Sequence, residues 1–162
     1  MLDSARPRAP AYEHTDLHVL IPRTVAMLGA QAEAKRIDVG VMLDAADPCV
    51  DCDEEQITQV VLNILMNGLQ ILHLGGRMQV ATHDDDAGVT IEVADDGPGI
   101  DPAERTRIFE AFFFRREGGI GLGLAVVQQI VLSHGGDIEA SDSPLGGALF
   151  RVRLPRQPES KS

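Results

Sequence analysis

The sequence predicts an α+β fold, a two-layer sandwich in which helices cover one face of a mixed, mostly antiparallel sheet of about five strands. Two observations predict it. Some segments place apolar residues at helical spacing, and shorter ones alternate apolar and polar residues as half-buried strands do. The predicted helices are residues 22–36, 54–72 and 121–134, and the predicted strands are residues 37–43, 49–53, 77–83, 89–94, 137–140 and 148–154.

The first predicted helix and strand carry clear periodic patterns. Residues 22–36 place Val25, Leu28 and Ala32 on one side of a helix. Residues 37–43 then read I-D-V-G-V-M-L, in which apolar and other side chains alternate as on a strand with one buried face. We therefore expect the domain to start with a helix followed by a strand.

The middle of the chain predicts a hairpin and then a long loop. Residues 77–83 and 89–94 are two strand patterns joined by an acidic turn at residues 84–88, which suits a β-hairpin. Between residues 96 and 119 no clear periodicity is present, so we expect a long loop or lid, and such loops in compact domains are usually functional. A helix pattern returns at residues 121–134, and a His-Gly-Gly sequence ends it because glycine readily takes the left-handed conformation.

The composition indicates a soluble globular domain and excludes several classes of function. Of the 162 residues, 44% are hydrophobic, which suits a packed core. The net charge of −11 argues against a general nucleic-acid binder, which would carry a basic stripe. No apolar run approaches the roughly 18 residues that span a bilayer, and the N-terminus lacks the pattern of a secretory signal. We therefore expect no membrane contact and a cytoplasmic location.

Cys49 and Cys52 form a lone C-x-x-C pair. A zinc site would need a second pair or a nearby histidine to complete it, and the sequence supplies neither. The pair lies in a predicted strand, where residues three apart point to opposite faces. Two buried or half-buried thiols are a better interpretation than a metal or redox site.

The predicted helix at residues 54–72 carries a stripe of amide side chains. Five amides fall within an arc of about 80°, namely Gln56, Gln59, Asn63, Asn67 and Gln70. A solvated helix edge would explain the glutamines. Asparagine is a poor helix former, however, and an amide oxygen is a plausible ligand for Mg²⁺. Asn67 and, four residues before it, Asn63 are therefore candidate functional residues.

Asp95 ends a predicted strand and is followed by Gly97 and Gly99. A carboxylate there can accept a hydrogen bond from the exocyclic amine of adenine, whereas guanine presents a carbonyl at that position. The glycines would let the backbone approach a base without a Cβ in the way. Taken alone, D-x-G-x-G is a weak signal, because aspartate and glycine are also the residues that turns prefer.

A second glycine cluster, Gly119, Gly121 and Gly123, opens the last predicted helix. Flexible glycines, free N–H groups and the positive end of a helix dipole suit a phosphate group. Other nucleotide motifs are excluded. A P-loop needs G-K-[ST], but the only lysines are Lys35 and Lys161, and the third glycine of a Rossmann fingerprint is replaced by leucine.

Between the two glycine clusters the chain concentrates four of its five phenylalanines, Phe109, Phe112, Phe113 and Phe114. One or two of them suit core filling, and four together suggest a lid anchored by aromatic contacts or an exposed patch for a partner. Arg115 and Arg116 follow and could reach terminal phosphate oxygens, although a solvated loop explains one of the two equally well.

The pieces together resemble the ATP-binding catalytic domain of sensor histidine kinases, particularly of the nitrogen-regulation type, over nearly the whole chain. Their N, G1, F and G2 boxes are similar to Q-V-V-L-N-I-L-M-N-G-L-Q, D-D-G-P-G-I, I-F-E-A-F-F and G-I-G-L-G-L-A. The resemblance implies the Bergerat fold, a sandwich with three helices on one face of the sheet and a flexible ATP lid, shared with gyrase, the Hsp90 chaperones and mismatch-repair ATPases.

The resemblance also implies roles for individual residues, with ATP and Mg²⁺ as cofactors. Asp95 would contact the adenine amine, Asn67 would ligate Mg²⁺, and Asn63 would orient the metal's water or the phosphates. The residues expected at the nucleotide are Asn63, Asn67, Asp95, Gly97, Gly99, Ile100, Phe112, Arg115, Arg116, Gly119, Gly121, Leu122, Gly123 and Leu124. Asn63, Asn67 and Arg116 are the expected catalytic residues. Because Asn63 stands where ATP-hydrolysing relatives place a glutamate base, phosphotransfer is favoured over hydrolysis.

Two departures from the family pattern leave an alternative open. Gly68 replaces the usual alanine after the second asparagine, and the lid reads F-F-F-R-R where relatives often show F-F-T-T-K. Arg116 keeps the positive charge, but the lid has lost its hydroxyls. The alternative hypothesis is a non-catalytic nucleotide-binding or interaction module, a pseudokinase with a degenerate lid.

None of the five histidines fits the phosphoacceptor pattern of a histidine kinase. We therefore expect an excised catalytic domain at residues 11–155, preceded by the truncated end of a dimerisation helix or linker at residues 1–10 and followed by a disordered tail at 156–162. Its partners would be the dimerisation and phosphoacceptor domain of the same kinase and, downstream, a response regulator. Alone, the domain should not autophosphorylate.

Overall fold

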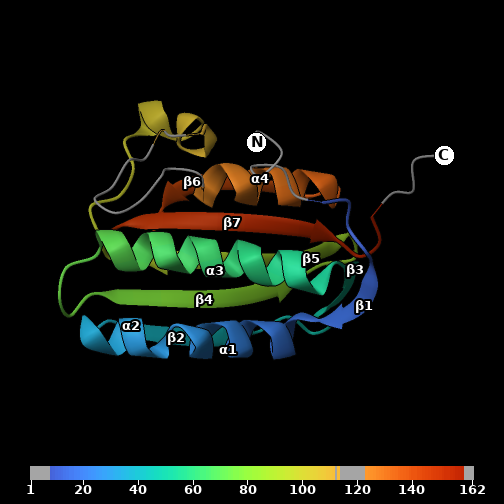
Figure 1. The fold of residues 1–162 in the computed structure, drawn as a ribbon, viewed down its shortest axis with the longest axis horizontal. Helices are drawn as coiled ribbons and strands as arrows, with labels where there is room; N and C mark the ends of the chain where they lie inside the picture. Colours follow the sequence, from blue (N-terminus) through green and yellow to red (C-terminus); the bar gives the residue numbers. More distant parts are fainter. Residues whose placement is uncertain (1–7, 112, 114–122, 159–162) are drawn as a thin grey trace.

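A computed structural model, which describes residues 8–111, 113 and 123–158, places a layer of helices against one face of a sheet (Figure 1). The sheet has five strands in the order β2 (Asp38–Leu43), β4 (Arg77–Asp84), β5 (Gly88–Asp95), β7 (Ala148–Pro155) and β6 (Asp137–Asp142). Only the β2–β4 pair is parallel, and the other pairs are antiparallel. The predicted two-layer α+β sandwich with a mixed, mostly antiparallel sheet is confirmed.

The helix layer consists of α1 (Leu17–Met27), α2 (Gly29–Ala34), α3 (Glu54–Ile71) and α4 (Gly123–Ser133). The core lies between the layers, where the buried side of α3 and α4 meets the inward-facing residues of β4, β5 and β7. Ile57, Ile91 and Ile130 are among its fully buried side chains. The opposite face of the sheet is charged: Arg151 of β7 pairs with Glu92 of β5 and Glu139 of β6, as expected for a solvated antiparallel face.

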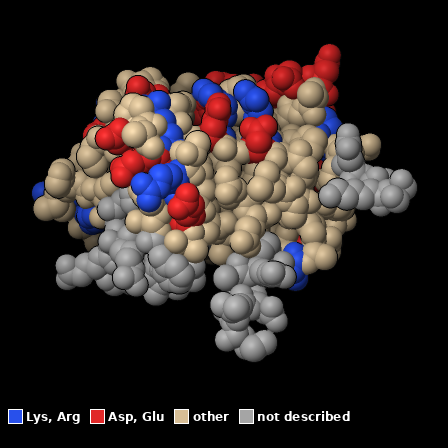
Figure 2. All heavy atoms as spheres, turned by 90° about the horizontal axis from the view of Figure 1, so that it is seen from above, with Lys and Arg blue, Asp and Glu red and all other residues tan. Residues whose placement is uncertain are grey.

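Figure 2 shows the molecule from above, with Lys and Arg side chains lying next to Asp and Glu side chains. Charges of both signs alternate there, so the face is mixed rather than a basic stripe. Within the described part of the chain, no helix combines the length and the apolar character needed to span a bilayer.

The first helix differs from its prediction at both ends. We expected one helix over residues 22–36, but α1 starts five residues earlier, at Leu17, and a break at Leu28 separates it from α2. Asp16 caps the start by accepting a hydrogen bond from the His18 N–H at 2.8 Å. Pro22, the first residue of the predicted helix, lies inside α1 instead.

A short strand, β1 (Glu13–Asp16), was not predicted. It pairs antiparallel with β3 (Cys49–Cys52) to form a two-stranded sheet beside the main one. Its four residues, E-H-T-D, carry no apolar alternation, so no sequence signal separates them from a loop. The strand prediction at the two cysteines is confirmed: Cys49 is half-buried, Cys52 is buried, and both are free thiols. Burial raises the pKa of Cys52 to about 11, which makes it unreactive.

The segment predicted as a structureless loop contains two short 3₁₀ helices, η2 (Pro102–Glu104) and η3 (Arg107–Phe109). Ile108 and Phe109 are buried, and the Phe109 ring meets Phe150 of β7 edge-on at 6.3 Å between centroids. The core-filling interpretation is therefore correct for Phe109. Residues 112 and 114–119 of the predicted lid lie outside the described residues.

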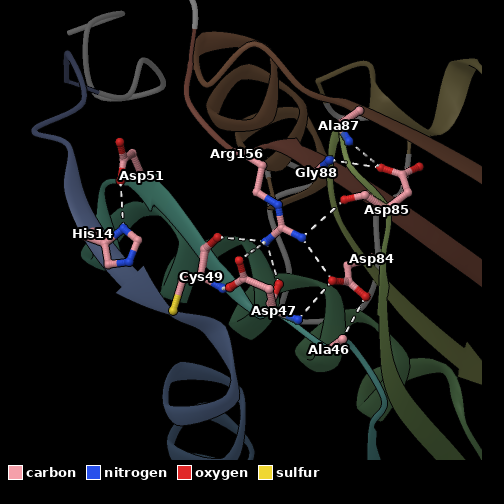
Figure 3. A network of polar contacts seen from close by, with 10 residues as sticks. All are labelled: His14, Ala46, Asp47, Cys49, Asp51, Asp84, Asp85, Ala87, Gly88 and Arg156. Atoms are coloured by element: carbon pink, nitrogen blue, oxygen red, sulfur yellow. Dashed lines mark hydrogen bonds and ion pairs between the residues drawn. The ribbon is translucent and has the colours of Figure 1, made fainter.

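Arg156 ties the end of the last strand to two distant segments (Figure 3). Its Nη1 donates to the backbone oxygens of Asp47 and Cys49, and its Nη2 donates to Asp84 Oδ2 at 3.0 Å. The Asp47 and Ala46 N–H groups hydrogen-bond the Asp84 carboxylate and, with Arg156, lower its pKa. The contacts of the domain thus extend to the first residue of the tail predicted at 156–162.

Candidate functional site

A narrow pocket lies where α3, the end of β5 and the start of β7 meet. Its lining residues come from these three elements and the turn after β5, namely Asn67, Ile71, Asp95, Pro98, Gly99, Ile100, Ala148 and Phe150. Four of them, Asn67, Asp95, Gly99 and Ile100, were expected from the sequence to share a site. The other walls are apolar or backbone, so the pocket suits a flat ring with a polar edge.

Asp95 is buried in this pocket and is held by backbone N–H groups. Its Oδ1 accepts hydrogen bonds from Gly97 at 2.9 Å and from Ala148 at 3.0 Å, and its backbone oxygen accepts one from Gly147 at 3.0 Å. The second carboxylate oxygen, Oδ2, makes no hydrogen bond to any described residue. One oxygen is therefore fixed by the protein, and the other remains available to accept a hydrogen bond from a ligand.

Gly147 makes this arrangement possible, and sequence reasoning missed it. A Cβ at Gly147 would lie 2.1 Å from Asp95 Oδ1 and 2.5 Å from the Gly97 nitrogen, so no other residue fits. The turn that follows Asp95 also requires glycine, because Gly99 has a φ of +77°. The G-G-A sequence directly before the last predicted strand was the available signal for Gly147 and Ala148.

The amide stripe on α3 is divided by the fold. Gln56 is buried, Gln59 and Gln70 are exposed, and Asn63 and Asn67 are half-buried one turn apart. Asn63 Nδ2 donates to the backbone oxygen of Gly123 at 3.4 Å. The Asn67 side chain lines the pocket and makes no hydrogen bond to a described residue. Of the five amides, only Asn67 lines the pocket, and Asn63 lies one turn away against the start of α4.

Gly68 has a structural explanation. A Cβ there would lie 2.3 Å from the Met78 Cε, because the Met78 side chain of β4 fills the space beside α3. Met78 is itself buried, 3% exposed. The loss of the usual alanine methyl is therefore compensated by a larger neighbour, and this departure from the family pattern does not reach the pocket.

The remaining predicted residues divide into three groups. Gly97 lies at the pocket edge beside Leu72, and Gly123 begins α4, where an added Cβ would meet no atom of a described residue within 4 Å. Leu124 is 5% exposed and packs in the core, so its side chain faces away from a ligand. Six predicted residues lie outside the described part of the chain, namely Phe112, Arg115, Arg116, Gly119, Gly121 and Leu122.

Phe113, a residue of the predicted lid, contacts η3 through Arg107. The Arg107 guanidinium lies 5.1 Å from the centroid of the Phe113 ring, within cation–π range. Among the residues that the structure describes, no three His, Cys, Asp or Glu side chains converge as they would at a protein-only metal site. A divalent cation held by Asn67 would therefore need ligands from a bound phosphate or water, as Mg²⁺ often has.

Comparison with known proteins places these features in a family. The family described as "Histidine kinase-, DNA gyrase B-, and HSP90-like ATPase" matches residues 52–158. The histidine-protein kinase AtoS of Escherichia coli K12 is 33% identical over 98% of this chain and 26% of its own length. The sensor histidine kinase ZraS of the same organism is 32% identical over 96% of the chain and 33% of its own length. The chain thus spans about a third or less of these curated relatives.

Solved structures agree with the sequence matches. The catalytic domain of histidine kinase ThkA superposes with a TM-score of 0.85 at 26% identity, covering 93% of this chain and 99% of that one. The mycobacterial sensor histidine kinase MprB has a TM-score of 0.80 at 32% identity, with coverage of 92% and 100%. The fold is therefore that of a histidine kinase catalytic domain.

Proposed function

We infer the function of this chain from one premise: it belongs to the family of histidine kinase-, DNA gyrase B- and HSP90-like ATPases. Its fold is that of a histidine kinase catalytic domain. We propose that it binds ATP with Mg²⁺ and presents the γ-phosphate to a histidine on a dimerisation and phosphoacceptor domain outside this chain. Its expected location is the cytoplasm.

The observation that carries the proposal is the geometry of Asp95. Two backbone N–H groups fix Oδ1, so the carboxylate cannot turn, and Oδ2 is left as an acceptor at the polar edge of an apolar pocket. The exocyclic amine of adenine is a donor and fits this acceptor, whereas the carbonyl of guanine would face a negative charge. Asp95 would therefore select ATP over GTP. The nucleotide complex of a related kinase, ShkA with AMPPNP, superposes on this chain with a TM-score of 0.81 at 28% identity.

The phosphate end of the site would use α3 and the start of α4. Asn67, whose amide makes no bond to a described residue, would ligate Mg²⁺, and Asn63 would orient a metal-bound water or a phosphate. Bound Mg²⁺ would neutralise charge on the phosphates. An amide at Asn63 cannot accept a proton as a glutamate base does, which supports transfer to a protein acceptor over hydrolysis. The glycines at 119, 121 and 123 and the arginines at 115 and 116 would contact the triphosphate.

None of the five histidines follows the phosphoacceptor pattern of a histidine kinase. His134 is also 1% exposed and bonded within the core, and His18 bonds Thr82 at 2.8 Å. The phosphoacceptor would come from a separate domain and the phosphoryl group would pass on to a response regulator, since ThkA, a relative with a TM-score of 0.85, has been solved in complex with a response regulator. Nothing in the matches favours the non-catalytic alternative.

Calorimetric titration with ATP, with ATP and Mg²⁺, and with GTP tests the proposal. We expect ATP to bind, Mg²⁺ to strengthen the binding, and GTP to bind much more weakly. Addition of a phosphoacceptor domain from a related kinase should then produce acid-labile phosphohistidine on that domain. Absence of adenine-nucleotide binding would refute the proposal, and sustained phosphate release by the chain alone would point to an ATPase of the gyrase kind.

A further inference from the structure

A second polar cluster lies at the far end of α3 from the pocket, where the N-terminal segment enters the domain. Its centre is Asp53, whose side chain is 3% exposed and caps α3 by accepting the Gln56 N–H at 3.0 Å. The other carboxylate oxygen accepts the Ala11 N–H at 2.8 Å. The Arg8 guanidinium hydrogen-bonds both oxygens, with Nη2 lying 3.2 Å from Oδ1. The buried Asp53 carboxylate therefore bonds the entering segment at two residues, Arg8 and Ala11.

Three further contacts hold the same segment. Gln56 is 4% exposed, and its Nε2 donates to the backbone oxygen of Arg8 at 2.6 Å. The Tyr12 hydroxyl donates to the Ser133 oxygen at the end of α4, at 3.1 Å. The Tyr12 ring also meets the His134 ring edge-on, with 5.5 Å between centroids. Residues 8–12 thus contact the start of α3 and the end of α4 together.

The two helices are bonded to each other at two places. Beside the entering segment, the Asp53 N–H donates to His134 Nε2 at 3.0 Å, and the opposite ring nitrogen of His134 bonds the Ile130 oxygen at 2.8 Å. Nearer the pocket, Asn63 in the middle of α3 bonds Gly123 at the start of α4. Between these two places the helices run antiparallel, as Figure 1 shows, and pack against each other along a seam.

We propose that Arg8, Ala11, Tyr12, Asp53, Gln56 and His134 form a positioning joint, through which the segment entering the domain sets the geometry of the nucleotide site. The inference rests on the proposed function, because it concerns the same site. Its physical basis is that α3 and α4 pack against each other from the joint as far as Asn63, in the middle of α3. A tightly packed seam transmits a displacement instead of absorbing it. A segment that holds the joint therefore fixes how Asn63 meets the start of α4, and Asn67 follows Asn63 one turn further along α3.

Coupling between two sites is reciprocal, which makes the joint testable in this chain. The test variants are Arg8→Gln, which removes the exposed half of the ion pair, and Asp53→Asn, which keeps a good helix cap but removes the charge. Arg23→Gln is the matched control, because Arg23 pairs with the neighbouring Glu54 at 3.5 Å and does not touch residues 8–12. Two quantities are measured: the affinity for ATP with Mg²⁺, and the hydrogen-exchange rate of the Ala11 amide.

We expect Arg8→Gln and Asp53→Asn to speed exchange at Ala11 and to weaken ATP binding about fivefold, with Arg23→Gln matching the wild type. Arg8→Lys should restore part of the affinity, and ATP should slow Ala11 exchange in the wild type. The joint proposal is overturned if the variants free Ala11 but change the affinity less than twofold, or if Ala11 exchange does not respond to Arg8→Gln. A wild-type chain that binds no ATP would instead refute the proposed function, and the coupling with it.

Discussion

The buried carboxylates at the joint and at the pocket are held differently. At the joint, Asp53 accepts hydrogen bonds on both carboxylate oxygens from Arg8, Ala11 and Gln56. At the pocket, Asp95 at the end of β5 uses one oxygen for the protein, and its other oxygen accepts no hydrogen bond from a described residue. Both carboxylates are almost fully buried. The two carboxylates therefore differ in how many of their oxygens the protein hydrogen-bonds, and not in how deeply they are buried.

This difference separates a structural carboxylate from one placed for a ligand. A buried acceptor that the fold satisfies completely contributes to stability, and its loss leaves donors without partners. A buried acceptor that the fold only half satisfies contributes less to stability and keeps its capacity for binding. Variants at the joint should therefore change mainly the free energy of unfolding, and variants at the pocket should change mainly the nucleotide affinity.

The largest effect is expected at Gly147. Gly147→Ala would place a methyl group inside van der Waals contact of Asp95 and Gly97, so either the carboxylate or the turn must move. We expect a destabilisation of about 3 kcal/mol in chemical denaturation and loss of measurable ATP binding. Gly29→Ala is the control, because a Cβ there meets no atom within 4 Å. An alanine at 147 that leaves ATP binding intact would show that the turn does not position Asp95.

Asp53→Ala should act on stability first. It removes a helix cap and leaves the Arg8 guanidinium and the Ala11 amide without their acceptor. We expect a loss of about 2 kcal/mol in the free energy of unfolding, against about 1 kcal/mol for Asp53→Asn, which retains capping. Equal losses for the two variants, measured by urea denaturation, would mean that the charge at Asp53 matters more than its capping bond.

A smaller effect is expected from pH. Burial lowers the pKa of His134 below its ordinary value of 6.5, so near that pH the unfolded chain binds more protons than the folded one. Stability should therefore fall as the pH drops through 6.5, by at most about 1.4 kcal/mol per pH unit from this group. His134→Gln should flatten this part of the curve. If the wild-type and variant curves stay parallel between pH 7 and 5, another histidine causes the loss.

A second pH window belongs to Asp53. Burial raises its pKa, but hydrogen bonds from Arg8, Ala11 and Gln56 outweigh burial and lower it to about 2. The folded chain is then deprotonated where the unfolded chain is not, so the stabilisation is present above about pH 4 and is lost as the pH falls towards 2. Asp53→Asn should lack this step in acid denaturation.

The sequence was sufficient for the fold and for the polar side chains of the pocket. Helical and alternating patterns predicted the sheet and helix layers, and Asn67 and Asp95 were recognisable because their residue types cost stability or mark a strand end. Gly147 was missed because its role is steric: it lies beside Asp95, which is far away in sequence. The joint was missed for a similar reason, since Arg8, Asp53 and His134 meet only through the fold.

Weak local signals explain the remaining differences. β1 is four residues long and depends on its pairing with β3 rather than on its own propensity. The start of α1 was placed too late, at residue 22, because the Asp16 cap and the helical residues that follow it were not recognised in the sequence. Propensity is a weak guide at such short or competing sites, where tertiary contacts decide the outcome.

Asp95→Asn provides the most direct test of the account. Asparagine can keep the Oδ1 bonds to Gly97 and Ala148, but it presents a donor where the carboxylate presents an acceptor. We therefore expect the ATP affinity in calorimetric titration to fall about 10- to 100-fold, with discrimination against GTP reduced and the free energy of unfolding changed by less than about 1 kcal/mol. Unchanged ATP affinity and unchanged discrimination in a folded variant would contradict the assignment of this pocket to adenine.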